Sequence, residues 1–146
     1  MASPKPKDWT LLSIAFSRAR PLTPVQLQKV LFLLGKQMPA EVGPTFYTFD
    51  AYDYGPFCRQ VYVDAEELRD EGLISMVTNP RGDWSDYAAS QAGIKNASDL
   101  AKLAPPKVVD HLAKLVTWVS KQTFLQLVKW VYANYPQYKK NSIFVD

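Results

Sequence analysis

The segment from Thr23 to Gly35 constrains the fold most strongly, because it predicts a helix that is apolar on most of its sides. Thr23 can cap such a helix, and Pro24 takes the first helical position, where its missing N–H costs nothing. Four aliphatic residues mark one face and two further apolar residues widen it: Leu27, Val30, Leu31 and Leu34, then Phe32 and Leu33. A helix of this kind needs neighbours around it, so it is predicted to lie near the centre of the molecule.

The rest of the chain alternates helical and extended patterns. Apolar residues at intervals of three and four predict helices over residues 9–19 and 57–71. An aromatic run predicts one strand within 45–54, which Gly55-Pro56 ends. Two further strands, 73–78 and 84–89, are predicted to form a hairpin around the turn 79–83. The last predicted elements are a short helix capped by Ser98 within 90–104, a helix from Pro106, and one from Thr123 that stops at Tyr135-Pro136.

Three helices followed by a hairpin is the element order of a winged helix-turn-helix. The 146 residues suit one domain. The expected fold is therefore α+β and mostly helical: a winged-helix-like core of three helices and a β-hairpin wing, with additional C-terminal helices. Residues 1–8 are expected to be a flexible tail, because two prolines and polar neighbours bury little surface. Residues 9–146 are expected to form a single winged-helix-like domain with a C-terminal helical extension.

Composition excludes several classes of protein. The hydrophobic fraction is 47% and the net charge is only +3, whereas disordered chains combine low hydrophobicity with high net charge. There is no apolar run of the roughly 20 residues that a membrane span needs, and the N-terminus lacks the apolar core of a signal peptide. Cys58, the single cysteine, cannot form an internal disulfide. These features favour a cytoplasmic protein in a reducing compartment.

The charge pattern bears on nucleic-acid binding. Residues 1–40 carry six basic residues against one acid, 41–90 carry three arginines against ten acids, and 91–146 carry eight lysines against three aspartates. The third helix, which usually enters the major groove in a winged-helix protein, lies in the acidic middle. Phosphates would repel its outer face, so DNA binding in the standard manner is not expected. A DNA-binding regulator that uses basic surfaces from the chain ends stays open as the alternative.

Candidate catalytic groups are few. Cys58 lies near a helix start, where the helix dipole can lower a thiol pKa, but a nucleophile also needs a base, and the only histidine, His111, lies in another helix. Asp50 and Asp53 could act as an acid–base pair, although solvation at a turn explains them more simply. One cysteine and one histidine do not supply a zinc site, and no glycine-rich phosphate loop is present. The sequence therefore predicts no enzymatic activity, no metal and no cofactor.

Two surfaces are candidates for binding a partner protein. Six aromatic residues fall within twelve positions: Phe46, Tyr47, Phe49, Tyr52, Tyr54 and Phe57. Alternate residues of a strand face opposite ways, so some of these rings are left outside the core, and exposed tyrosines are typical of binding hot spots. The acidic outer face of the third helix is the second candidate, as a docking site for a basic partner. The residues predicted to bind the partner are Tyr47, Phe49, Tyr52, Tyr54, Asp64, Glu66 and Glu67.

Two segments of the chain resemble a known family. The run Leu27-Gln28-Lys29-Val30-Leu31-Phe32 is similar to the opening motif of the Panacea domain, an antitoxin-associated family. The run Ala51-Tyr52-Asp53-Tyr54-Gly55-Pro56-Phe57 is similar to the aromatic-x-Tyr-Gly-Pro segment of that family. The likeness covers most of residues 9–90 and departs at Gln26, where the family usually has lysine, and in the hairpin. The end of the chain, with Trp130-Val131-Tyr132 and Tyr135-Pro136-Gln137-Tyr138, is more weakly similar to a related group of uncharacterised bacterial winged-helix-like proteins. The motif residues, to which we assign a structural role, are Leu27, Gln28, Lys29, Tyr54, Gly55 and Pro56.

The resemblance implies a protein-binding module of bacterial or phage origin and not an enzyme. Such a module would neutralise a toxin by direct binding or deliver it to a protease. A structural or host-manipulating phage protein is a further interpretation. The expected partner is a protein, with DNA less favoured and no membrane involved, and the chain could form a homodimer.

Overall fold

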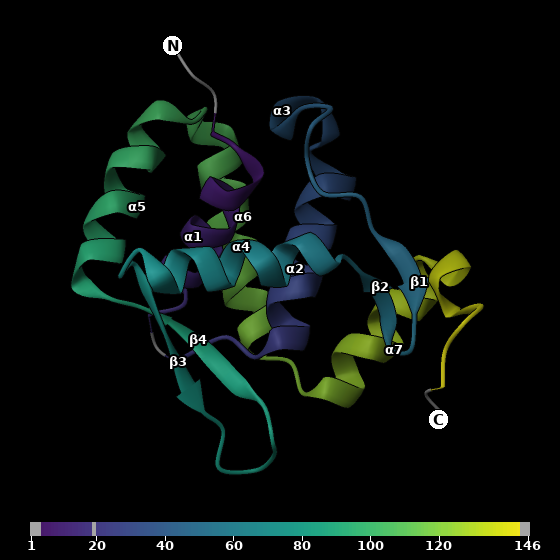
Figure 1. Cartoon of the computed structure of the whole chain (residues 1–146). Coiled ribbons are helices and arrows are strands. Elements are labelled where there is room, and N and C mark those ends of the chain that lie inside the picture. The colour runs from purple at the N-terminus through teal and green to yellow at the C-terminus, as the bar shows by residue number, and fades with distance from the viewer. Residues whose placement is uncertain (1–3, 19, 144–146) are drawn as a thin grey trace.

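Figure 1 shows the protein as a computed structural model that describes residues 4–18 and 20–143. Those residues form an α+β fold that is mostly helical, as the sequence predicts. The helices are α1 (Pro6–Phe16), α2 (Pro24–Gln37), α3 (Pro39–Val42), α4 (Arg59–Asp70), α5 (Gln91–Leu103), α6 (Pro106–Ser120), α7 (Phe124–Asn134) and the 3-10 helix η1 (Pro136–Lys139). Two separate antiparallel sheets pair β1 (Asp50–Tyr52) with β2 (Gly55–Phe57), and β3 (Ile74–Thr78) with β4 (Ser85–Ala89). Within the described ranges, none of the helices has the length and apolar character that crossing a membrane requires.

Helix α2 lies at the centre of the molecule, as predicted. Its start is a reciprocal capping box, in which the Thr23 hydroxyl accepts from the Gln26 amide and the Gln26 side chain accepts from the Thr23 amide. The eight residues 27–34 are all buried. Helices α1, α6 and α7 pack against α2 and supply the apolar cover that its sequence requires (Figure 1).

Helix α1 begins and ends earlier than the sequence predicts. Pro6 takes the first helical position, and the Asp8 carboxylate accepts a hydrogen bond from the Lys5 amide at 2.8 Å. Because residues 6–8 form the first helical turn, the predicted flexible tail over 1–8 is too long, and residues 1–3 lie outside the described part of the chain. The helix ends at Phe16, and the predicted end at Ala19 falls on a residue outside the described ranges.

The short strand predicted within 45–54 is present as β1, but it does not end the extended region as predicted. Strand β1 instead turns back into β2, so that Gly55 and Pro56 begin a second strand rather than ending the first. Gly55 has a φ of +103°, a backbone conformation that favours glycine and allows the tight reversal after Tyr54. Pro56 has no backbone N–H to donate. Strand β2 tolerates it because each strand of a two-stranded ribbon has an outer edge where backbone donors have no partner strand.

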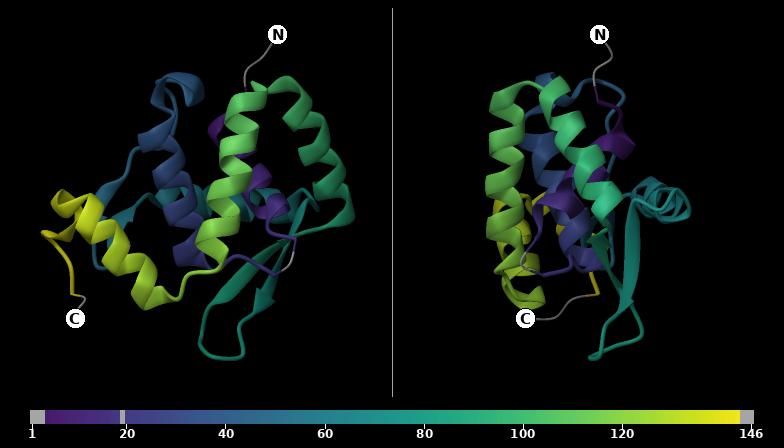
Figure 2. Two further views of the ribbon diagram at one scale, coloured as in Figure 1. Left: turned by 180° about the vertical axis from the view of Figure 1, so that it is seen from behind. Right: turned by 90° about the vertical axis from the view of Figure 1, so that its left-hand side faces the viewer.

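The predicted third helix and the hairpin after it are confirmed within about two residues, as α4 and β3–β4. The hairpin projects from the body of the molecule (Figure 2). Its base is held by Leu22, which exchanges two backbone hydrogen bonds with Tyr87 at 2.8 and 3.0 Å. The segment before α2 therefore extends the pairing of β4.

Helix α5 is longer than predicted and starts elsewhere. The Ser90 hydroxyl accepts from the Gly93 amide at 3.0 Å and caps a helix of 13 residues, whereas Ser98, the predicted cap, is exposed in its middle. A Cβ atom on Gly93 would lie 1.9 Å from the Leu73 carbonyl oxygen, so only glycine permits this close approach. Helices α6 and α7 begin at Pro106 and after the Thr123 cap, as predicted.

Candidate functional site

The two sequence motifs meet where α2 faces the β1–β2 hairpin. The Gln28 side chain donates to the Cys58 carbonyl and accepts from the Cys58 amide, each at 2.9 Å. Its neighbour Lys29 donates from Nζ to the Pro56 carbonyl at 3.2 Å. Two polar residues on an apolar helix thus satisfy the backbone of the segment that leads into α4. These contacts agree with the structural role expected for the motif residues.

Gly55 allows the hairpin to approach Lys29 closely. A Cβ atom on Gly55 would lie 3.3 Å from Cε1 of Tyr132 and 3.8 Å from Nζ of Lys29. The positive φ of Gly55 adds strain for any residue with a side chain. Glycine at this position therefore keeps the hairpin, α2 and α7 in contact.

Lys29 is an ionisable side chain buried among the apolar residues of α2. The residue is 3% exposed, and burial lowers the pKa of its amine to about 7. A protonated lysine has three N–H donors, and the Pro56 carbonyl is the acceptor that the described residues offer it. No ion pair joins it to a carboxylate within the described part of the chain.

A pocket of about 180 Å³, which we call the Lys29 pocket, opens beside this amine. Its lining residues are Val25, Gln28, Lys29, Tyr52, Asp53, Tyr54, Gly55, Pro56, Phe57 and Tyr62. Aromatic rings form much of the wall: Tyr52 stacks on Phe57 with 5.0 Å between centroids, and Phe57 meets Tyr62 edge-on at 5.4 Å. The pocket therefore combines aromatic walls with one buried amine.

Three exposed rings lie beside this pocket, and we call them the aromatic rim: Tyr52, Tyr54 and Phe124. Their exposed fractions are 54%, 40% and 44%. Tyr54 packs edge-on against Phe124 with 5.1 Å between centroids, so the hairpin and α7 share one aromatic surface. Sequence reasoning predicted the two tyrosines and missed Phe124, whose helical spacing places it with the buried face of α7.

Tyr47 and Asp64, both predicted to bind a partner, are joined in a hydrogen-bond network at the wall of a surface cavity of about 520 Å³. Asp64 is 6% exposed and accepts hydrogen bonds from the Tyr47 hydroxyl at 2.5 Å and the Gln60 amide at 2.8 Å. The Thr10 hydroxyl lies 2.7 Å from the Tyr47 oxygen. Burial, followed by the hydrogen bond to Asp64, raises the pKa of Tyr47 well above its usual range. The network occupies the polar atoms of both residues, and their predicted role in docking a partner stays a prediction.

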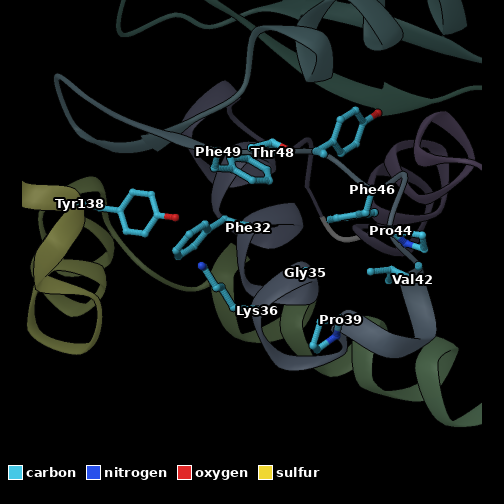
Figure 3. Close-up of a pocket in the computed structure, with 12 residues that line it drawn as sticks. Phe32, Gly35, Lys36, Pro39, Val42, Pro44, Phe46, Thr48, Phe49 and Tyr138 are labelled. Atoms are coloured by element: carbon cyan, nitrogen blue, oxygen red, sulfur yellow. The ribbon is translucent and has the colours of Figure 1, made fainter.

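A second pocket, of about 270 Å³, lies between α2, α3 and η1, and we call it the α3 pocket (Figure 3). Phe49, another predicted partner-binding residue, lies here and is half-buried, with its ring edge-on to Phe32 at 5.6 Å. Figure 3 shows Lys36 beside the Phe32 ring, with Tyr138 opposite. The Lys36 amine is 5.8 Å and 5.5 Å from the centroids of those two rings. The chain's own cation thus already engages the aromatic wall of the α3 pocket.

The acidic outer face of α4 is partly neutralised within the chain. Glu66 and Glu67 are exposed, as predicted. The Lys7 amine, however, lies 3.4 Å from Glu67 and 2.8 Å from Glu71, and these carboxylates raise the pKa of Lys7. Glu67 is therefore paired with Lys7, whereas Glu66, the other carboxylate predicted to dock a partner on this face, is not part of this group of ion pairs.

The candidate catalytic residues are not brought together. Cys58 is half-buried with its backbone held by Gln28, and His111 bonds to Gln37 at 2.7 Å on another part of the surface. Asp50 is exposed, and Asp53 lines the Lys29 pocket. Among the residues that the structure describes, no group of three His, Cys, Asp or Glu side chains is placed to hold a metal ion.

No family model, no curated protein and no solved structure matches this chain. The Lys29 pocket and its aromatic rim are therefore the features from which a function is inferred.

Proposed function

We propose that this chain is a protein-binding module whose partner docks on the aromatic rim. The observation that carries the proposal is the grouping of Tyr52, Tyr54 and Phe124 beside a pocket, each with two fifths or more of its surface exposed. Apolar surface grouped in this way marks interaction sites, and tyrosine is enriched among binding hot spots. A shallow rim around a pocket suits a partner that inserts one side chain and covers the surrounding rings.

Binding in this proposal acts as steric neutralisation of the partner or as its delivery to a protease, as in Panacea-type antitoxins. We further propose that α1, α2, α4 and the β3–β4 hairpin are a winged-helix-like core to which α5, α6 and α7 are added. The element order supports this assignment. The hydrogen bond from Lys29 of the first motif to the Pro56 carbonyl of the second supports a shared structural role for the two motifs.

The alternative proposal is a DNA-binding regulator that uses basic surfaces of the chain ends. The hairpin that projects after α4 favours it, since a wing contacts DNA in winged-helix proteins (Figure 2). Three basic residues of the chain ends already pair with carboxylates: Lys7 with Glu67 and Glu71, Lys107 with Glu41, and Lys114 with Asp110. Protein binding therefore remains the first proposal.

Affinity purification of the tagged chain from an extract of its host at low salt tests the proposal. We expect a partner protein in stoichiometric amount and little nucleic acid. The double variant Tyr52→Ala/Tyr54→Ala should bind the partner at least about tenfold more weakly, because one hot-spot ring contributes about 2 kcal/mol or more and about 1.4 kcal/mol already corresponds to a factor of ten. Leu103→Ala is the matched control, because Leu103 is as exposed as Tyr52, at 54%, and lies on α5 at the other end of the molecule (Figure 1).

Equal partner recovery with the double variant and the control would contradict docking on the aromatic rim. Abundant nucleic acid that is released as salt rises would support the DNA-binding alternative instead.

A further inference from the structure

Lys29 presents an amine that the fold leaves short of acceptors. Its Nζ atom makes one hydrogen bond, to the Pro56 carbonyl at 3.2 Å, within the described residues, and the residue is 97% removed from solvent. A buried ammonium with unused donors is costly, and an anion placed against it recovers much of that cost. Lys29 lines the Lys29 pocket together with Pro56, whose carbonyl holds the amine, and Gly55, so we infer that an anion entering the pocket comes close to the amine.

The size of the Lys29 pocket limits what can enter. Its volume of about 180 Å³ is below the roughly 300–1,000 Å³ of pockets that enclose a whole small ligand. One side chain of a larger partner suits this space, with the partner's remaining surface resting on Tyr52 and Tyr54 outside. Phe57 and Tyr62 give the pocket apolar ring surface, beside which a charge pair is stronger than in bulk water.

We propose that the Lys29 pocket is a carboxylate-binding site, in which an acidic side chain of the partner protein enters between the aromatic rings and pairs with the Lys29 amine. The source of the carboxylate rests on the proposed protein-binding function. The site itself rests on the burial of Lys29, its single acceptor and the pocket beside it.

The charged and titratable groups around Lys29 set how this site responds to pH. They are Asp53, Tyr52 and Tyr54 of the hairpin, Tyr62 of α4, and Tyr132 of α7, which lies across Gly55 from the amine. Burial raises the pKa of Tyr62 and of Tyr132, so both phenols stay neutral near neutral pH. Asp53 carries a negative charge at the pocket wall and opposes a second carboxylate, so Asp53→Asn should tighten binding.

Binding of a carboxylate should therefore be linked to protonation of Lys29. With an amine pKa of about 7, the pair forms without proton uptake below that pH. Above that pH the amine must take up a proton when a carboxylate binds, so the affinity for the carboxylate should fall about tenfold per pH unit.

Propionate, the side-chain acid of glutamate, is the probe, and propionamide is its neutral match. Both are titrated into the full-length ¹⁵N-labelled chain at constant ionic strength, and the amide signals of Tyr54 and Gly55 are followed by NMR. We expect propionate to shift these signals saturably and propionamide to leave them in place. Lys29→Met should remove the response, and Lys36→Met, two turns further along α2, should keep it.

Equal responses to the two probes, or an unchanged response in Lys29→Met, would overturn the proposal. If Lys29→Met does not fold, the wild-type titration decides: propionate affinity that stays constant from about pH 6 to about pH 9 would overturn it as well. The proposed function fails separately. If propionate binds but no partner protein is captured, the carboxylate site is supported and the proposed protein-binding function is not. If partner capture requires the aromatic rim but is unchanged by Lys29→Met and by pH, the protein-binding function is supported and the carboxylate site is not.

Discussion

Lys29 places an amine among apolar side chains of α2, with the Pro56 carbonyl as its acceptor. In the unfolded chain this amine is hydrated and keeps its ordinary pKa of 10.5, whereas in the folded chain burial lowers the pKa to about 7. Between those two values the unfolded state binds more protons than the folded state. The free energy of unfolding therefore rises with pH through this window.

Lys29→Met should abolish this pH dependence. The wild-type chain should gain about 2 kcal/mol of unfolding free energy between about pH 7 and about pH 9, because one pKa unit corresponds to about 1.4 kcal/mol. The variant should show a nearly flat profile and be at least as stable near pH 7, since methionine fills a similar volume without a buried charge. Urea denaturation at both pH values measures the difference. Identical slopes for the two proteins would show that the Lys29 amine is not buried as described.

At the residue scale, the sequence identifies the aromatic and acidic side chains near the β1–β2 hairpin, but it does not predict which of them are exposed to solvent. Tyr52 and Tyr54 are exposed, whereas Tyr47 is half-buried and donates a hydrogen bond to the buried Asp64. Strand alternation cannot separate these tyrosines, because residues 45–54 are not one strand. The burial of Lys29 is likewise hidden in the sequence, since it depends on a hairpin that folds back over α2.

At the scale of elements, the Tyr47 hydroxyl joins three parts of the fold. It contacts Thr10 on α1 and Asp64 on α4, while its own backbone belongs to the segment before β1. Gln60, one turn earlier on α4, donates to the same carboxylate. A network that is satisfied in this way fixes the position of the segment against both helices.

Tyr47→Phe should weaken this connection without creating a cavity. Losing the hydroxyl removes one hydrogen bond to a buried carboxylate and leaves Thr10 without this partner, which should cost about 1–3 kcal/mol. The melting temperature should fall by about 2–4 °C for each kcal/mol in a chain of this size. Tyr52→Phe, on a half-exposed ring, is the matched control and should change stability by less than about 0.5 kcal/mol. Equal melting temperatures for the two variants would contradict the hydrogen-bond network.

Elements with strong local signals are predicted correctly from the sequence. Helices α2 and α7 begin at Thr23 and Thr123, each with a capping box, and α4 and β3–β4 lie within about two residues of their predicted bounds. The β1–β2 hairpin and the start of α5 are missed. The β1–β2 hairpin depends on the approach of Gly55 to Tyr132, which no local pattern contains. The start of α5 has a local signal, the Ser90 cap, but Ser98 offers a second cap of the same residue type, and the contact of Gly93 with Leu73 that accompanies the start at Ser90 is not local.

At the scale of the whole molecule, the functional features gather at one end. The hairpin β1–β2 and α7 carry the aromatic rim, while α5 lies at the opposite end in Figure 1 and in the left view of Figure 2. The C-terminal segment supports this end, because the Ile143 amide donates to the Asp53 carbonyl and the Asn141 side chain donates to the Ala51 carbonyl. The fold thus fixes the hairpin from two sides and leaves its tyrosines exposed.

Site-specific photo-crosslinking in the native host tests the central claim most directly. A benzoylphenylalanine in place of Tyr54 should give one discrete cross-linked protein, because the partner covers the aromatic rim. The same group in place of Leu103, on α5, should give none, and the Tyr54 cross-link should disappear when Tyr52→Ala and Phe124→Ala are added. Equal cross-linking from both positions, or none from position 54 while a partner still co-purifies, would show that the partner binds elsewhere.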